Sequence, residues 1–91
     1  MTAYTNSKGF KVIKASMQEV VAIGGYGICD SCSSASFYGN IIPALNGHWY
    51  CEKCYQEWLK RAKYYEEDRE FEARCNEYYL NLLQDKGAKN E

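Results

Sequence analysis

Two Cys-x-x-Cys pairs, an Asn-Gly dipeptide between them and a helical pattern after them predict the fold class of this 91-residue chain. We expect a small α+β zinc-binding domain, in which a zinc knuckle, a β-hairpin and a helix are followed by an additional C-terminal helix. A chain of this length makes one domain with a modest core, and a structural metal would supplement that core.

The cysteine spacing is the strongest signal. The first pair is Cys29-Asp-Ser-Cys32, the second is Cys51-Glu-Lys-Cys54, and eighteen residues separate them. Four thiolates close a tetrahedral shell, which is a ligand set of structural zinc, with iron as the main competing metal. A catalytic zinc would keep one position open for water, and the lone histidine, His48, is not needed to complete the shell. We therefore expect one structural zinc ion bound by these four cysteines.

The residues before the cysteines divide into two parts. Residues 1–9 are polar and predict a flexible lead-in, whereas residues 10–27 predict a segment that packs on the core. Phe10 to Lys14 is a weakly indicated strand. The run from Ser16 to Glu19 is a capping box, which predicts a short helix. Its apolar face comprises Met17, Val20, Val21. Because Val20 to Ile23 is rich in β-branched residues, a strand there is the alternative.

The predicted zinc module spans residues 28–65. Phe37 to Leu45 reads as an extended strand, and Pro43 favours a position at the sheet edge. Asn46-Gly47 is a strong hairpin signal because both turn positions need positive φ. The returning strand, His48 to Tyr50, would deliver Cys51 to the metal. A helix follows Cys54, with its apolar residues at helical spacing. These are Tyr55, Trp58, Leu59, Ala62.

The C-terminal part has a second apolar face, out of phase with the first. It comprises Phe71, Cys75, Tyr78, Tyr79, Leu82, Leu83. We favour a helix break near the acidic run Glu66 to Asp68, with a C-terminal helix over 66–87 and a tail over 88–91; one helix over 52–84 is the alternative. Four of these residues, Phe71, Cys75, Tyr78 and Leu82, follow an a/d rhythm. That seam would fold back onto segment 10–23 or meet a second chain, so monomer and dimer both stay open.

A knuckle, a hairpin and a second Cys-x-x-Cys pair that opens a helix resemble the treble-clef zinc finger. The segment from Ile28 to Ala62 resembles GATA-type fingers in the order of its ligands and hairpin. It is similar to the second half of LIM domains from Trp49 to Tyr55, and to the N-terminal zinc-binding domain of Clp unfoldases in its eighteen-residue interval. The resemblance implies that the four cysteines are the ligands. It also implies binding to DNA for the first family and to proteins for the other two.

Charge favours a protein partner over nucleic acid. The net charge is −1, and Lys53 is the only basic residue between the outermost cysteines. A DNA-binding finger needs Lys and Arg to neutralise phosphates and to reach base edges. The one basic cluster, Lys60, Arg61 and Lys63, precedes the acidic run Glu66 to Glu72. The sequence thus favours a protein-interaction or adaptor module, with nucleic-acid binding through this cluster as the alternative. Regulation of a larger complex is what the fold analogy alone implies for such a module.

The remaining expectations concern chemistry, partner surface and compartment. No catalytic set can be assembled around His48, and Cys75 is a buried apolar residue in this interpretation, so we do not expect an enzyme. The tyrosines expected to face a partner are Tyr64, Tyr65, Tyr79. No apolar run is long enough to cross a membrane. The first residues contain no apolar signal segment, which favours a cytoplasmic protein with reduced thiols over two disulfides.

Overall fold

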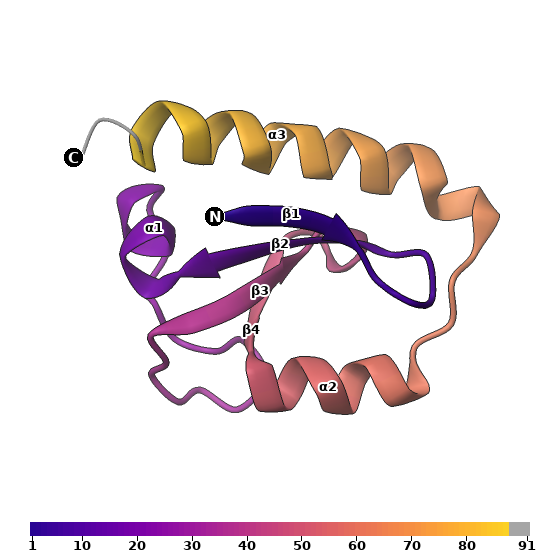
Figure 1. Cartoon of the computed structure of the whole chain (residues 1–91), viewed down its shortest axis with the longest axis horizontal. Coiled ribbons are helices and arrows are strands. Elements are labelled where there is room, and N and C mark those ends of the chain that lie inside the picture. Colours follow the sequence, from indigo (N-terminus) through magenta and orange to yellow (C-terminus); the bar gives the residue numbers. More distant parts are fainter. Residues whose placement is uncertain (88–91) are drawn as a thin grey trace.

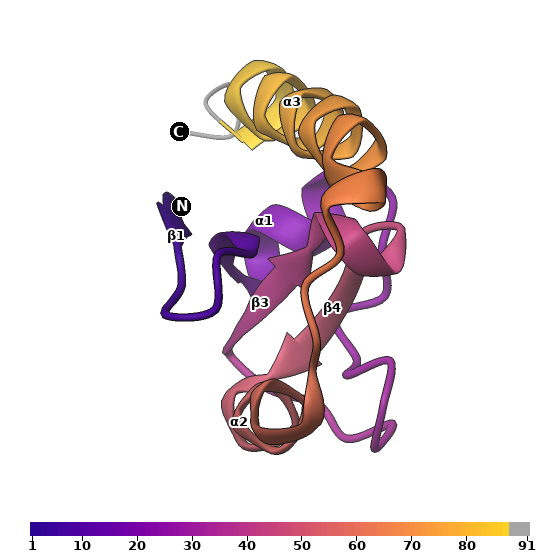
Figure 2. The same ribbon diagram turned by 90° about the vertical axis from the view of Figure 1, so that its right-hand side faces the viewer.

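The structure, a computed structural model, describes residues 1–87 as a small α+β domain with a four-stranded antiparallel sheet. The strands are β1 (Thr2–Thr5), β2 (Lys11–Ser16), β3 (Tyr38–Ile42) and β4 (His48–Cys51). The helices are α1 (Met17–Ala22), α2 (Glu52–Arg61) and α3 (Arg69–Gly87), with 3₁₀ turns η1 (Pro43–Leu45) and η2 (Glu66–Asp68). The strand order is β1-β2-β3-β4, and Figures 1 and 2 show α2 and α3 on opposite sides of the sheet. The predicted tail, residues 88–91, lies outside the described residues.

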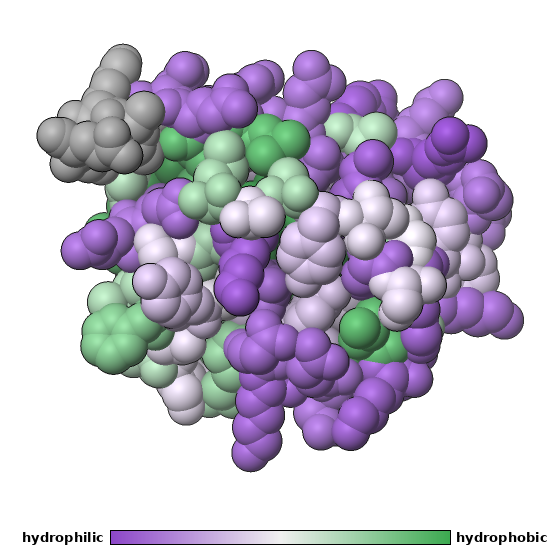
Figure 3. Space-filling model, in the orientation of Figure 1, coloured by the Kyte–Doolittle hydropathy of each residue, from purple (hydrophilic) through white to green (hydrophobic). Residues whose placement is uncertain are grey.

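Both faces of the sheet are buried at its inner strands, β2 and β3. Successive strand residues point to opposite faces, so Val12 and Ile13 enter two different clusters, as do Ile41 and Ile42. The α3-side cluster comprises Ile13, Ala15, Val20, Ile41, Trp49, Leu83. The α2-side cluster comprises Phe10, Val12, Ile42, Tyr55, Trp58. Helices cover both faces, and Figure 3 shows mainly hydrophilic side chains on the outer sides of α2 and α3.

A strand, β1, lies where the sequence predicts a flexible lead-in, and that prediction is wrong for residues 2–5. β1 pairs with β2 along its whole length, from Thr2 opposite Lys14 to Thr5 opposite Lys11. The Asn6 side chain closes the connecting turn, because its Oδ1 accepts hydrogen bonds from the N–H groups of Lys8 and Phe10, both at 3.0 Å. All four residues of β1 are exposed. An edge strand of this kind needs no apolar pattern, so hydrophobic periodicity could not reveal it.

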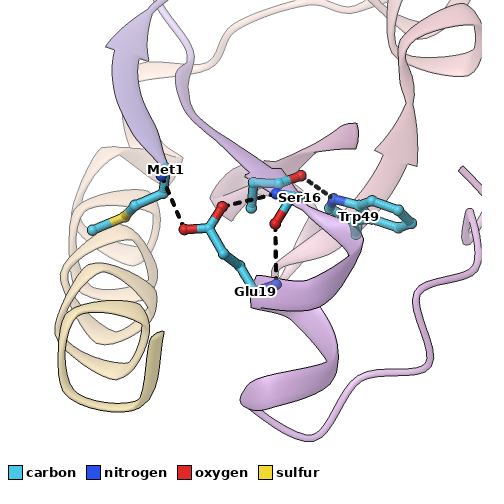
Figure 4. A network of polar contacts seen from close by, with 5 residues as sticks. Met1, Ser16, Glu19 and Trp49 are labelled. Carbon is cyan, nitrogen blue, oxygen red and sulfur yellow. Dashed lines mark hydrogen bonds and ion pairs between the residues drawn. The ribbon is translucent and has the colours of Figure 1, made fainter. Parts of the chain in front are cut away.

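The capping box at the start of α1 is confirmed (Figure 4). The Ser16 hydroxyl group accepts from the Glu19 N–H at 3.2 Å, and the Ser16 N–H donates to Glu19 Oε1 at 2.9 Å. The other carboxylate oxygen of Glu19 lies 2.9 Å from the Met1 amino group. Next to this network, the indole N–H of Trp49 donates to the Ala15 carbonyl at 3.2 Å. The capping box therefore joins β1, the end of β2 and α1.

The alternative of a strand over Val20 to Ile23 is wrong, because α1 extends to Ala22. One helical face is buried as predicted at Val20, with Met17 packed beside it, but Val21 is exposed. Adjacent helical residues point about 100° apart. A six-residue helix that meets the core along a narrow line can bury one of these two valines, and here it buries Val20.

The hairpin between β3 and β4 contains the predicted positive-φ pair, with φ of 58° at Asn46 and 81° at Gly47. Gly47 is also required for space, since an added Cβ would collide with the Tyr79 ring of α3. The predicted edge position is wrong: β3 is an inner strand, paired with both β2 and β4. Pro43 lies just beyond the strand, as the first residue of η1. Its missing N–H therefore removes no bond from the ladder.

The chain breaks between α2 and α3, as the acidic run predicts, and α3 folds back onto the α3-side cluster. Leu83 packs there with Val20, so the fold-back is confirmed within the described residues. The predicted seam is out of phase, because 42% of Phe71 and 59% of Tyr78 remain exposed. The buried positions are Glu72 and Leu83, with Tyr79 and Leu80 partly buried. The apolar pattern predicted the wrong buried face because one residue of the true buried face, Glu72, is charged.

We expect Leu83→Ala to lower the free energy of unfolding by about 2–5 kcal/mol, because it opens a cavity under α3. Phe71→Ala is the matched control, and should cost less than about 1 kcal/mol because the ring is largely solvated. Urea denaturation of the metal-loaded proteins measures both. Equal losses, or a larger loss for Phe71→Ala, would show that α3 docks through the predicted seam instead.

Glu19 should make stability depend on pH. Partial burial raises the pKa of Glu19, but hydrogen bonds from Ser16 and the charge of the Met1 amino group outweigh it, so the pKa lies below its ordinary value. The unfolded chain then binds more protons between the folded and unfolded pKa values. We expect Glu19→Gln, which keeps the cap but not the charge, to be less stable than the parent by about 1 kcal/mol at neutral pH. This difference should vanish as pH falls through the folded pKa; parallel urea titrations over pH measure it, and a constant difference would contradict it.

Candidate metal centre

Three different elements bring the four cysteines together. Cys29 and Cys32 lie in the loop between α1 and β3, Cys51 is the last residue of β4, and Cys54 lies in the first turn of α2. Their Sγ atoms all lie within 4.8 Å of one another. The four predicted ligands therefore form one cluster, which suggests a structural metal-binding module.

The sulfur spacing fits a tetrahedral ion. At a Zn–S distance of about 2.3 Å, two ligands of a regular tetrahedron are roughly 3.8 Å apart. The Sγ atoms of Cys32 and Cys51 are 3.9 Å apart. All of these cysteines are free, so the cluster is not a pair of disulfides. Donor type, donor number and spacing all suit an ion such as zinc, and no fifth group is needed.

A tight loop shapes the first cysteine pair. The Cys29 N–H donates to the Ser34 carbonyl at 3.0 Å, and the Ser33 N–H donates back to the Cys29 carbonyl at 2.9 Å. Ser33 adopts the left-handed region, with φ of 62°. A β-bridge between Ile28 and Ala35 closes the base of the loop. We call residues 26–38 the knuckle segment. The small polar residues of this segment are compatible with this geometry, because short side chains suit such tight turns.

Backbone N–H groups support the sulfur of Cys29. The N–H groups of Ser31 and Cys51 point at this Sγ, at 3.4 and 3.3 Å. Cys29 is the most deeply buried ligand, with 1% of its surface exposed. Burial raises the pKa of its thiol, but N–H donors from Cys32, Cys51 and Ser31 outweigh this effect, and the pKa is lowered. The site therefore stabilises a thiolate at Cys29, which is the form that binds metal.

Asp30 attaches the knuckle segment to β4, and sequence reasoning missed this role. Its N–H donates to the Trp49 carbonyl at 2.9 Å, while its Oδ2 accepts from the Trp49 N–H at 2.9 Å. The two hydrogen bonds pair the backbone N–H and C=O groups of Trp49 on the outer edge of β4, as a neighbouring strand would. The available signal was an aspartate directly after the first cysteine, a residue type that often binds nearby backbone groups.

The thiol groups of Cys32 and Cys54 differ in pKa. Hydrogen bonding from Ser34, with neighbouring sulfur atoms, lowers the pKa of Cys32 to about 6. At Cys54 the Ser31 hydroxyl group acts in the same direction, but burial and the three nearby sulfur atoms outweigh it and raise the pKa to about 12. Like charges this close cannot all be present without a counterion. A bound cation would let all four sulfur atoms be thiolates, with release of protons.

A polar network holds the start of α2 against the sheet. The buried Asn40 of β3 donates to Glu52 Oε1 at 3.2 Å and accepts from the Tyr4 hydroxyl group at 3.4 Å. Gln56 donates to the other oxygen of Glu52 at 2.7 Å. This bond, despite partial burial, lowers the pKa of Glu52, and burial raises the pKa of Tyr4. The network fixes the turn of α2 that carries Cys54, and it depends on β1, which the sequence did not predict.

The remaining predicted residues lie away from the metal cluster. His48 is exposed and its ring stacks on Tyr50, with centroids 6.4 Å apart. Cys75 is partly buried on α3, and burial raises the pKa of its thiol. The candidate partner residues Tyr64, Tyr65 and Tyr79 do not form one surface. Tyr64 packs on the α2-side cluster and Tyr79 on the α3-side cluster, while Tyr65 is exposed.

The predicted basic cluster lies around the C-terminal end of α2. Lys60 is 3.6 Å from Glu57, and the Lys63 ammonium group is 5.8 Å from the centre of the Tyr65 ring. Lys8, from the turn after β1, joins Lys60, Arg61 and Lys63 there. Its Nζ donates to the carbonyl groups of Lys60 and Ala62, at 3.3 and 2.8 Å. This ammonium group complements the negative end of the helix dipole, so it has a structural role.

No protein-family model matches this chain, and no significant match was found among curated proteins or solved structures. Within residues 1–87, none of the helices combines the length and apolar character that crossing a membrane requires.

Purified protein should carry one zinc ion per chain, bound by the four clustered cysteines. Cys51→Ser should abolish stoichiometric binding and loosen the end of β4 and the start of α2, because the metal would link these elements directly and only hydrogen bonds such as those of Asp30 and Glu52 hold them without it. Cys75→Ser, which removes a thiol outside the cluster, should leave the metal content unchanged. Elemental analysis and near-ultraviolet dichroism test both variants. A Cys51→Ser protein that keeps the parent dichroism after chelation would refute the structural role of the metal.

Proposed function

We propose that this chain is a treble-clef zinc module with an additional C-terminal helix. The order of the ligands supports this proposal: a knuckle carries the first pair, a hairpin delivers Cys51, and the first turn of a helix carries Cys54. Four thiolates are the ligand set of closed structural sites, so the zinc would stabilise the fold and leave no position for a substrate. His48 is exposed and outside the cluster, which supports a module without catalytic activity.

The module acts as a protein-interaction or adaptor domain in this proposal, and the knuckle segment is the binding surface. The observation that carries it is the exposure of large apolar side chains on this one segment: 89% of Tyr26 and 76% of Phe37 face solvent, and Ile28 and Tyr38 are also exposed. The β-bridge from Ile28 to Ala35 brings the two arms of the segment together. In Figure 3, pale and green side chains gather on the left, near the end of β2 and the start of β3.

Energetics support a protein partner at this surface. Solvent-exposed aromatic residues often contribute much of the binding energy of a protein interface, because they bury a large area and lose little side-chain entropy when the partner binds. The zinc would pre-organise the knuckle segment, so that little ordering is needed on binding. Tyr65 is a second exposed aromatic, but it lies at the far end of α2 from the metal cluster.

Nucleic-acid binding has less support. Lys8 adds a cation to the predicted basic cluster, yet its ammonium group is engaged by two helix carbonyls. Lys60 lies next to Glu57, and the acidic turn η2 follows Lys63 in the chain. A surface of mixed sign gives weak, salt-sensitive attraction to phosphates.

Capture from a lysate with zinc-loaded protein tests the proposal. We expect a specific partner to be retained after nuclease treatment, retained by Tyr78→Ser, and lost by the double variant Tyr26→Ser and Phe37→Ser. Tyr78 is the matched control because it is also an exposed aromatic residue but lies on α3. Loss of binding after nuclease treatment, or upon Lys60→Glu with Arg61→Glu but not upon the knuckle substitutions, would establish nucleic-acid binding instead.

A further inference from the structure

A small pocket opens where the chain crosses from α2 to α3, remote from the metal cluster. Its volume is about 140 Å³. A cavity of roughly 150 Å³ holds a molecule the size of benzene, so this pocket suits a group of five or six heavy atoms. The lining residues that matter here are Phe10, Trp58, Tyr64, Tyr65, Asp68, Glu72.

Four of the ten residues that line the pocket are aromatic. Phe10 packs against Trp58 at a centroid distance of 4.9 Å and an angle of 60°, and against Tyr64 at 5.3 Å and 84°. The rings thus stand at steep angles to one another and form a corner rather than a stack. Tyr65 adds a fourth ring at the exposed side. The faces of such rings carry negative potential and attract cations.

A buried carboxylate stands in the same wall. Only 2% of Glu72 is exposed, and its Oε2 accepts a hydrogen bond from the Lys11 N–H at 2.9 Å. Among the side chains of residues 1–85, no Lys or Arg forms an ion pair with Glu72, and the Met1 amino group pairs with Glu19 instead. A buried carboxylate without a countercharge is unfavourable, so a cation in the pocket would relieve this cost. Tyr64 and Glu72 line the same pocket, so the carboxylate and the aromatic ring belong to one wall.

The rim already attracts a cation. The exposed Lys63 places its ammonium group 5.8 Å from the centre of the Tyr65 ring, within the range of a cation–π contact. Asp68 is exposed at the same rim. Lys63 is therefore a competitor that a better-fitting cation would displace into solvent.

We propose that this pocket binds a trimethylammonium group. Three properties favour a methylated cation over a plain ammonium ion: the apolar aromatic wall, the volume, and the single buried carboxylate, which cannot replace a full shell of hydrogen-bonding water. A trimethylammonium group is quaternary, so it has no N–H groups that need hydrogen-bond acceptors and loses little hydration on entry. It keeps the positive charge that attracts Glu72 and the aromatic rings. The proposal is independent of the function proposed for the knuckle segment.

Binding is tested by titrating zinc-loaded protein with tetramethylammonium and choline, followed by the indole resonance of Trp58 and the amide resonances of Tyr65 and Glu72. Both cations should give saturable shifts at constant ionic strength. The neutral carbon analogue of choline, 3,3-dimethylbutan-1-ol, should bind more weakly by about tenfold or more. Equal binding of the neutral analogue, or no saturable shift with either cation, would overturn the proposal.

Variants locate the site. Glu72→Gln and Tyr65→Ala should each weaken choline binding by about tenfold. Tyr65 is exposed, so its variant tests the pocket even if Glu72→Gln proves unstable. Lys63→Gln should strengthen binding because it removes the competing ammonium group, and Phe71→Ala, an exposed ring outside the pocket, should change nothing. Unchanged affinity in Tyr65→Ala, or weaker binding in Lys63→Gln, would contradict the assignment.

Two further ligands distinguish the source of the group. Trimethyl-lysine in a blocked single-residue peptide represents a modified protein, and phosphocholine represents a lipid headgroup. We expect at least one of them to bind more tightly than tetramethylammonium, and the tighter one identifies the source. If both bind more weakly than the bare cation, the pocket does not recognise either type of ligand and the proposal fails.

Discussion

The convergence of four cysteine sulfur atoms to within 4.8 Å is the constraint on which the rest of the structure depends. Four thiolates cannot stay this close without a counterion, because their like charges repel one another. Three elements meet there: the knuckle segment, the end of β4 and the first turn of α2. Their relative positions are further fixed by the paired bonds between Asp30 and Trp49 and by the two N–H groups that point at Cys29 Sγ. A metal at this point would therefore hold the hairpin and α2 in place together.

The sheet connects the cysteine cluster to the rest of the fold. Because β2 and β3 are buried on both faces, each side needs its own cover, which α2 provides on one side and α1 with α3 on the other. Trp49 links the metal site to the α3 side. Its indole lies so close to Gly39 that an added Cβ there would collide with it, and its N–H reaches the Ala15 carbonyl. This small chain thus has two modest hydrophobic clusters, one on each face of a shared sheet.

Buried polar side chains fix the relative positions of elements that apolar packing alone would hold less specifically. Asn40 connects β1 to the start of α2, and Glu72 connects the first turns of α3 to the start of β2. Satisfied polar groups of this kind specify one arrangement, since any shift leaves a donor or acceptor unpaired. In Glu72 the same feature creates the anionic wall of the aromatic pocket. The knuckle segment contributes no residue to this pocket, so the two proposed binding sites do not overlap.

The sequence by itself determined the local features. Cysteine spacing gave the cluster, the capping box gave α1, Asn46-Gly47 gave the positive-φ turn, and the acidic run gave the break between α2 and α3. Each depends on residues close in the chain, where spacing and backbone preference are decisive. Only the tertiary structure decided the strand order, the inner position of β3, the pairing of β1, and the face that α3 buries. These depend on contacts between distant residues: Thr2 to Thr5 have no apolar pattern, and Glu72 is buried because the backbone of Lys11, sixty-one positions away, offers it an N–H.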